Sequence, residues 1–209
     1  MGGDEITFRI ICMALLLAVG TVRDGVRVAS WIRTRSVKGP LEALIEIIQT
    51  RRDRLVTSWP MTVFGAASFG GIAAYILAPQ MVSWGHVTLT ASWRWAGVAL
   101  GAVAAGGEIW SLLFLGKQYS ALLRIRPDHE LVAKGPYAWV RHPMYSFGLP
   151  WMAAFGLIAA NWFILVTGVA TIVFAMILRT PDEEGMMAQQ FGESYRRYQQ
   201  QTGRFLPRL

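Results

Sequence analysis

The sequence predicts an all-α integral membrane protein with about five transmembrane helices, and three observations support this prediction. Of the 209 residues, 54% are hydrophobic and only 16% are charged, whereas soluble domains carry more charge. Apolar runs that approach the width of a bilayer recur along the chain, and Lys and Arg gather in the segments between them. Since no repeat or low-complexity tract divides the sequence, we expect a single membrane domain over residues 1–209.

The apolar runs define the expected spans. They cover residues 6–22, 61–78, 93–115, 143–160 and 162–178. A helix needs roughly 20 residues to cross a bilayer, so the last two spans are short. The first run lacks the basic start of a signal peptide and is followed by Arg23, so we expect it to remain as a span.

The distribution of basic residues predicts the orientation. Residues 23–60, 116–142 and 179–209 hold 8, 5 and 5 Lys or Arg, and five spans place all three segments on one side. Because cytoplasmic loops accumulate Lys and Arg, we expect the N-terminus outside and the C-terminus inside. The net charge of +7 then reflects topology, and nucleic acid is not an expected partner.

The sequence offers little for a metal centre or a disulfide. Cys12 is the single cysteine, and His86, His129 and His142 are scattered along the chain. The Gly-x-Gly-x-x-Gly loop of a soluble dinucleotide-binding fold is also absent from the sequence. We therefore expect no metal and no such soluble domain.

Two polar clusters flank the last pair of spans. Residues 135–145 read GPYAWVRHPMY and residues 179–184 read RTPDEE, and no charged residue lies between Pro143 and Leu178. A hairpin that turns around at Asn161 would bring both clusters together at the cytoplasmic surface. They would then offer guanidinium, imidazole, aromatic and carboxylate groups, which suit a zwitterion with a heterocycle, such as S-adenosylmethionine.

Two further helices are expected beside the membrane. Thr180 and Pro181 match an N-cap and a first helical position, with Glu183 as a capping-box acid. An amphipathic cytoplasmic helix should start there, and its apolar face would be Met187, Phe191, Tyr195 and Tyr198. Residues 41–48 form either an interfacial helix or a simple link between spans.

Span three combines small residues with an acid. Small residues between Gly101 and Gly107 allow close helix packing, and Glu108 follows them about 10 Å inside the membrane. An acid at this depth either faces a wet cavity with a function or is satisfied by a neighbouring helix.

The ordered motifs resemble one family. Gly-Pro-Tyr, Arg-His-Pro-x-Tyr, an apolar hairpin, Arg-x-x-x-Glu-Glu and Phe-Gly-x-x-Tyr follow one another through the C-terminal half. This combination resembles the isoprenylcysteine carboxyl methyltransferase family and the related membrane phospholipid N-methyltransferases. One departure is Phe147, which stands where the family often has glycine.

The resemblance implies a membrane methyltransferase that uses S-adenosylmethionine. It assigns to the cofactor His129, Glu130, Leu131, Val132, Tyr137, His142, Pro143, Met144, Tyr145 and Glu183. The pocket would form from residues 129–145 and 179–198. Arg179 would be the catalytic residue that contacts the methyl acceptor, with Glu108 and Glu184 as further candidates for substrate contact.

The expected reaction is carboxyl O-methylation of a lipidic or hydrophobic acceptor. A carboxylate attacking a sulfonium needs only orientation, whereas an amine or phenol needs a base such as Glu108, His129, His142 or Glu184. A prenylated cysteine, a phospholipid, a quinone-like lipid and a small hydrophobic acid all stay open as acceptors. Two other functions also remain, an NADPH-dependent enzyme like the sterol reductases and a non-catalytic membrane scaffold.

Overall fold

The computed structural model describes residues 3–34, 40–116 and 130–208, with side chains from 4–26, 28–29, 59–116 and 130–208. Its helices are α1 (Gly3–Thr34), α2 (Pro40–Leu77), η1 (Pro79–Gly85), α3 (Ala91–Leu115), η3 (Gly135–Ala138), α4 (Pro143–Ile158), α5 (Trp162–Leu178), α6 (Thr180–Phe191) and α7 (Glu193–Gln201). Over these described ranges, β pairing is limited to two isolated bridges, His86 with Asn161 and Val140 with Gly203. The all-α prediction is confirmed.

The number of membrane spans can be compared with the expected five. In the described part of the chain, four segments are long and apolar enough to cross a membrane, namely Asp4–Val26, Trp59–Leu77, Ala91–Leu115 and Trp162–Phe191. The remaining predicted span, 143–160, forms α4, whose 16 residues rise only about 24 Å. A hydrocarbon core is about 30 Å thick, so α4 is a shorter member of the bundle and the count of five is not confirmed.

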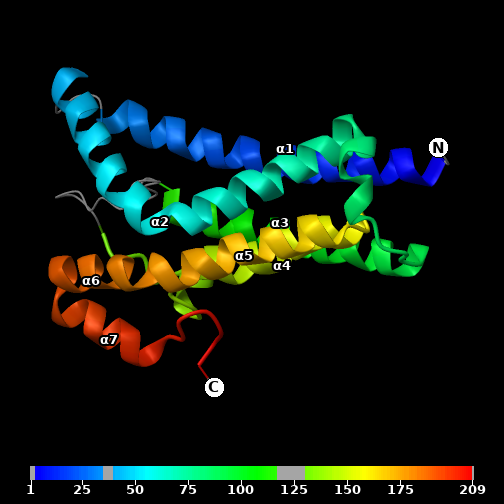
Figure 1. The fold of residues 1–209 in the computed structure, drawn as a ribbon. Coiled ribbons are helices and arrows are strands. Elements are labelled where there is room, and N and C mark those ends of the chain that lie inside the picture. The colour runs from blue at the N-terminus through cyan, green and yellow to red at the C-terminus, as the bar shows by residue number, and fades with distance from the viewer. Residues whose placement is uncertain (1–2, 35–39, 117–129, 209) are drawn as a thin grey trace.

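The membrane helices lie side by side in one bundle (Figure 1). The N-terminus, η1 and the turn between α4 and α5 gather at one end, and α6 and α7 lie at the other, which we call the charged end. Helix α2 changes direction along its length, and Pro60 lies inside it, where a proline removes a backbone hydrogen bond. The first part of α2 contains residues 41–48, so that segment is helical and continuous with the second span.

Helices α3 and α4 approach each other through glycines. A Cβ atom on Gly97 would lie 2.8 Å from Cβ of Leu157, and one on Gly107 would lie 2.2 Å from Cδ1 of Phe147. Side chains larger than hydrogen therefore do not fit at either position. The small residues of span three serve helix packing. Phe147 occupies the space over Gly107, which explains how this chain accommodates a phenylalanine there.

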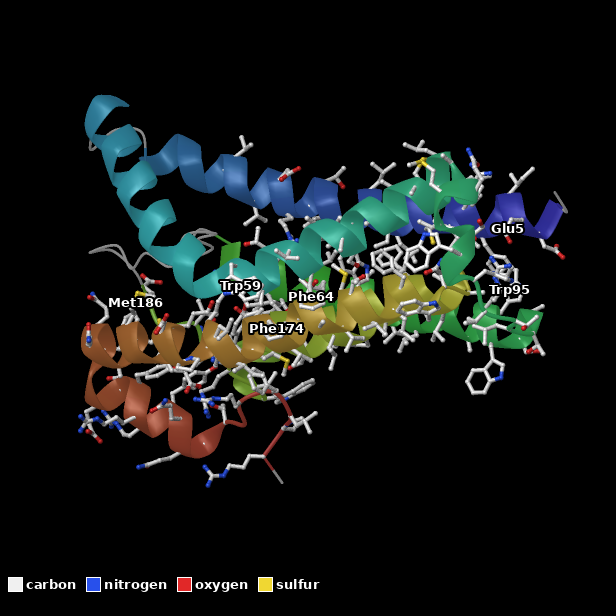
Figure 2. The ribbon with its side chains drawn as sticks, viewed as in Figure 1. Glu5, Trp59, Phe64, Trp95, Phe174 and Met186 are labelled. Atoms are coloured by element: carbon white, nitrogen blue, oxygen red, sulfur yellow. The ribbon has the colours of Figure 1, made fainter. Side chains whose placement is uncertain are left out.

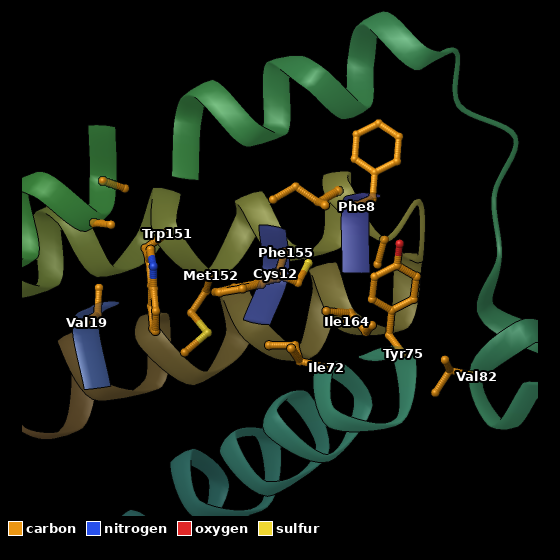
Figure 3. Packing of buried hydrophobic residues seen from close by; sticks show 14 residues of the cluster. Phe8, Cys12, Val19, Ile72, Tyr75, Val82, Trp151, Met152, Phe155 and Ile164 are labelled. Carbon is orange, nitrogen blue, oxygen red and sulfur yellow. The ribbon is translucent and has the colours of Figure 1, made fainter. Parts of the chain in front are cut away.

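A buried apolar cluster joins the five long helices (Figure 3). Its members include Phe8, Cys12 and Val19 of α1, Ile72 and Tyr75 of α2, Ala104 and Ala105 of α3, Trp151 and Phe155 of α4, and Ile164 of α5. The single cysteine is a free and fully buried part of this packing. The cluster fixes the mutual positions of the helices that carry the functional side chains.

The predicted hairpin is present, and Asn161 secures its turn. The Asn161 side-chain oxygen accepts hydrogen bonds from the backbone nitrogens of Phe163 and Ile164 at 3.0 and 3.2 Å, which caps α5. The Asn161 amide nitrogen donates to the carbonyl of Val82 at 2.7 Å and so ties the turn to η1. The hairpin returns the chain to the charged end, as the sequence predicts.

Candidate active site

A cavity of about 640 Å³ extends from the charged end into the helix bundle. Polar residues line one part of it: Glu130, Tyr137, Arg141, His142, Tyr145, Arg179 and Glu183. Apolar residues of the spans line another part: Met61, Ala66, Phe69, Met152, Ile172 and Ala175. This volume is typical of a site for a cofactor or a small ligand. The lining of the cavity suits occupants that have both a polar and an apolar part.

The two polar clusters meet at this cavity. The Tyr145 hydroxyl donates to Oε1 of Glu183 at 2.9 Å, and Nδ1 of His142 lies 3.4 Å from Oε2 of Glu183. Nε of Arg179 lies 3.6 Å from the same glutamate. Glu183 therefore joins the first cluster, at the start of α4, to the second cluster at the start of α6.

A second carboxylate, Glu184, is buried behind the cavity wall. It pairs with Nε of Arg141 at 3.0 Å, with Nε2 of His142 at 3.3 Å and with Arg204. A buried charge is tolerated when it is paired in this way. Arg141 also donates to the backbone carbonyls of Gln199 and Thr202, so the group holds the end of α7 and the residue after it against the start of α4.

His142 bridges the two glutamates. Burial lowers the pKa of His142, but hydrogen bonds and charges from Glu183 and Glu184 raise it, and the net pKa lies above its usual value. When the ring is protonated, it has two N–H donors, one for each carboxylate. His142 thus fixes Glu183 toward the cavity and Glu184 toward the arginines.

Aromatic rings form a wall beside these charges. The Tyr198 hydroxyl donates to the backbone carbonyl of Tyr137 at 2.6 Å, which ties α7 to η3. The ring of Tyr145 stacks on His142 with centroids 5.8 Å apart, and Phe205 lies 5.8 Å from the His142 ring. Helix α7 contributes Tyr195 and Tyr198 to the lining of the cavity.

The predicted site residues divide into three groups by position. Those that line the cavity are Glu108, Glu130, Leu131, Val132, Tyr137, His142, Pro143, Met144, Tyr145, Arg179 and Glu183. Glu184 is outside the lining and contacts the cavity residues Arg141 and His142 from behind. His129 lies outside the described residues.

The start of α6 differs from the expected capping box. Arg179, not Thr180, precedes the helix, and it has helical backbone angles with no side-chain cap. The hydroxyl of Thr180 is buried without a hydrogen-bond partner in the described structure. The prediction is wrong because α5 passes almost directly into α6, which leaves the Glu183 side chain free to reach Arg179 and Tyr145.

The expected C-terminal helix is also divided. Gly192 adopts φ +53 between α6 and α7, a left-handed conformation that glycine tolerates. The chain bends there and returns along α6, which brings Tyr195 and Tyr198 to the cavity. In Figure 2, Met186, another cavity residue, lies on α6 at the charged end, whereas Glu5 and Trp95 lie at the opposite end.

Sequence reasoning missed several residues near the cavity, and Arg23, Trp151 and Arg204 are among them. Arg23 of α1 lies with Nη2 3.6 Å from Oε2 of Glu108, and both residues line the cavity. Trp151 also lines it, and Arg204 pairs with Glu184. Arg23 stood out only as a basic flank of the first span, and nothing in the sequence linked it to an acid on span three.

The fold and the site define a class of protein. The chain is a multi-pass integral membrane protein whose helices enclose a cavity that is charged at one end and apolar between the spans. Residues 98–189 match the model of the isoprenylcysteine carboxyl methyltransferase (ICMT) family, which confirms the resemblance seen in the motifs.

Curated relatives and a solved structure agree with this match. The chain is 29% identical over 150 residues to a probable protein-S-isoprenylcysteine O-methyltransferase of Oryza sativa subsp. indica, covering 64% of this chain and 75% of the rice protein. It is 29% identical over 119 residues to the protein-S-isoprenylcysteine O-methyltransferase of Schizosaccharomyces pombe, covering 52% of this chain and 48% of that protein. The solved eukaryotic intramembrane Ras methyltransferase ICMT superposes with a TM-score of 0.57 and 22% identity, over 99% of this chain and 68% of the other.

The chain is therefore an integral membrane methyltransferase that uses S-adenosylmethionine. The side chains of the site fit this cofactor, because carboxylates for an ammonium group stand beside aromatic rings for a nucleoside and a sulfonium. The NADPH-dependent and scaffold alternatives find no support in these comparisons.

Proposed function

We propose that this enzyme transfers the methyl group of S-adenosylmethionine to the carboxylate of a lipidic acceptor, and that a prenylated cysteine is such an acceptor. The single observation that supports this most strongly is the continuity of the cavity, which joins the charged residues around Glu183 to apolar walls from the spans. The names of the relatives in rice and fission yeast support the acceptor class.

In this proposal the cofactor occupies the charged part of the cavity. Glu183 is held by Tyr145 and His142 and presents its carboxylate for the ammonium group. Glu130 to Val132 and the ring of Tyr137 line the same part and suit the nucleoside. Pro143 and Met144 complete this wall, and His129 stays a predicted contact.

Arg179 orients the acceptor. It lies at the junction of α5 and α6, lines the cavity, and meets Glu183 only at 3.6 Å, which leaves its guanidinium donors open to a carboxylate. Bound S-adenosylmethionine supplies an electrophilic methyl group, so the acceptor carboxylate needs placement and exclusion of water rather than deprotonation. The low polarity of the apolar walls favours a reaction in which two opposite charges disappear.

The same proposal includes the sidedness and organisation of the protein. We place the charged end at the cytoplasmic face, with the N-terminus outside, because the predicted basic segments share one side in the sequence and Arg141, Arg179 and Arg204 lie at that end. A water-soluble cofactor then enters from the cytoplasm and the acceptor from the lipid. The chain works as one membrane domain without a metal ion, and its C-terminal helix α7 lies amphipathically over the pocket.

A methyl-transfer assay tests this function. Purified enzyme in lipid nanodiscs is given labelled S-adenosylmethionine together with an N-acetyl-S-prenylcysteine that has either a free carboxylate or a carboxamide. We expect label to be incorporated only into the free acid, where it forms a methyl ester. Treatment with base should then release the label as methanol. Label in phosphatidylethanolamine, with none in the free acid, would overturn the proposal.

A further inference from the structure

The segment after α7, residues 202–208, lies against the first polar cluster, and we call it the C-terminal strap. In Figure 1 it turns back from the end of α7 toward the bundle. Three backbone hydrogen bonds tie it to the cluster: Gly203 donates to Trp139 at 3.3 Å, Arg141 donates to Gly203 at 2.8 Å, and His142 donates to Arg204 at 3.1 Å. The strap therefore holds the stretch of backbone that leads into α4.

The strap is a tight turn with little conformational freedom. A Cβ atom on Gly203 would overlap the carbonyl oxygen of Leu206, so only glycine fits at that position. The hydroxyl of Ser146, in the first turn of α4, donates to the carbonyl of Phe205 at 2.6 Å. The side chains of Arg204 and Phe205 consequently start from fixed points beside the charged network.

Arg204 sets the orientation of the Glu184 carboxylate. Oε1 of Glu184 accepts from Nε of Arg141 at 3.0 Å and lies 3.3 Å from Nε2 of His142. Oε2 accepts from both Nε and Nη2 of Arg204. Because a forked guanidinium holds a carboxylate in one plane, Arg204 prevents the rotation that would turn Oε1 away from His142.

Phe205 packs on the two side chains that hold Glu183. Its ring centroid lies 5.8 Å from that of His142 and 6.4 Å from that of Tyr145, in tilted and edge-on arrangements that aromatic pairs favour. Tyr145 donates to Glu183, and Nδ1 of His142 lies 3.4 Å from the same carboxylate. Phe205 therefore restricts the movement of both contacts of Glu183.

A continuous set of contacts thus runs from the strap to the cavity. It passes from Arg204 through Glu184 and His142 to Glu183. Glu183 lines the cavity, whereas Arg204 and Phe205 lie outside its lining. The two strap residues can influence a bound molecule only through the side chains that they hold.

We propose that Arg204 and Phe205 are positioning residues for S-adenosylmethionine. They hold His142 and Tyr145 so that the Glu183 carboxylate faces the ammonium group of the cofactor. This inference rests on the proposed function, which places that ammonium group at Glu183. The affinity for the cofactor then depends on the strap, whereas the rate of methyl transfer from bound cofactor does not.

The test measures the Kd of S-adenosylhomocysteine by calorimetry on the full chain in nanodiscs, at a temperature where every variant is folded. Arg204→Gln should raise the Kd about fivefold, because a buried carboxylate oxygen loses its charged donor. Phe205→Leu should raise it about threefold, as for the loss of an aromatic contact. A wild-type Kd in either variant would overturn the inference.

Arg208→Gln is the matched control within the strap. Arg208 donates to the backbone carbonyl of Gln200 and has no printed-length contact with Glu184 or His142 among the described hydrogen bonds and ion pairs, so its removal should leave the Kd unchanged. A rise in Arg208→Gln equal to that in Arg204→Gln would show a general loosening of the strap and would overturn the inference.

Two further readouts distinguish positioning from a purely structural role. In Arg204→Gln the KM of S-adenosylmethionine should rise while kcat stays at the wild-type value, and a lowered kcat with an unchanged KM would contradict the inference. In a Glu183→Gln background, Arg204→Gln should raise the Kd by less than about twofold, since the group through which it acts has already changed. Full additivity of the two changes would refute the route through Glu183.

The binding measurements contain no acceptor, so they separate this inference from the proposed function. If Glu183→Gln alone leaves the Kd unchanged, the proposed cofactor placement is refuted and the route from the strap is refuted with it. If Glu183→Gln raises the Kd and Arg204→Gln does not, the placement stands and only the positioning role fails. Failure of the wild type to methylate a prenylated cysteine refutes the proposed reaction and leaves the binding results in force.

Discussion

The two ends of the bundle each contain an arginine of a membrane helix opposite a glutamate, but the pairs differ. At the end opposite the charged end, the Arg94 guanidinium donates to Glu5, to the hydroxyl of Tyr75 and to the carbonyl of Ile158, each at 2.8 Å. It also lies 4.0 Å above the ring of Phe8. Each nitrogen of this arginine has a partner, and the contacts join α1, α2, α3 and α4.

The pair at the cavity is open by comparison. Arg23 meets Glu108 at 3.6 Å, and its Nε atom is buried without a partner in the described structure. The difference shows that an intramembrane arginine can serve two purposes. Arg94 uses its donors within the protein and holds helices together, whereas Arg23 lines the cavity and has a longer contact with its glutamate.

This comparison predicts that changes at the charged end impair chemistry and that changes at Arg94 impair stability. The largest expected effect is that of Arg179→Ala, because the acceptor carboxylate loses its orienting guanidinium. We expect the single-turnover rate of methyl transfer to fall about 1,000-fold, within the range for loss of one oriented stabilising group. Arg179→Lys should recover part of the rate, because it restores the charge without the planar fork.

The next largest effect is expected at Arg94. Arg94→Leu leaves Glu5 without its ion-pair partner and should lower the free energy of unfolding by about 3 kcal/mol. Thermal unfolding in nanodiscs measures the change. The double variant Glu5→Gln with Arg94→Leu should recover stability. Each single variant should methylate its acceptor at the wild-type rate below its unfolding temperature. A loss of turnover in the folded Arg94→Leu variant would contradict the assignment of chemistry to the charged end and of stability to the opposite end.

Glu183→Gln should weaken cofactor binding. The change keeps the shape and the Tyr145 contact but removes the negative charge that faces the cavity. We expect the Kd of S-adenosylhomocysteine to rise about tenfold, as for the loss of one charge-assisted hydrogen bond. Asp182→Asn, one residue earlier in the same first turn, is the matched control and should leave the Kd unchanged.

The smallest expected effect is a pH dependence from His142. Its pKa is raised in the folded protein, so its charged contacts with Glu183 and Glu184 contribute stability below the ordinary value of 6.5. This contribution is lost as the pH rises through the raised pKa. The unfolding temperatures of the wild type and of His142→Asn should therefore differ more at pH 6 than at pH 9. A difference that is constant or grows with pH would show that His142 is neutral in the folded state.

The sequence was sufficient for features set by local chemistry or by topology. Apolar runs predicted the long helices, and the uncharged stretch before Arg179 predicted a hairpin that joins two polar clusters. The sequence also indicated that the span over 143–160 is short, and α4 is slightly shorter still because its apolar run extends into the turn. The sequence did not predict the break at Gly192, because the apolar spacing continues across that position.

Contacts between distant helices could not be predicted from the sequence. Arg23 and Glu108 are separated along the chain and meet only because α1 packs on α3. The network of Arg141, Glu184 and Arg204 likewise depends on how the segment after α7 folds back. Residue types gave the chemistry of the site, whereas tertiary packing decided which carboxylate faces the cavity and which lies behind it.

The most direct test of the central claim, that the charged end carries the reaction, is the single-turnover rate of methyl transfer in Arg179→Ala and Arg94→Leu. Both variants are measured side by side at a temperature where each is folded and saturated with S-adenosylmethionine. We predict a rate about 1,000-fold below the wild type for Arg179→Ala and a wild-type rate for Arg94→Leu. Equal rates in the two variants, or a loss confined to Arg94→Leu, would contradict the account.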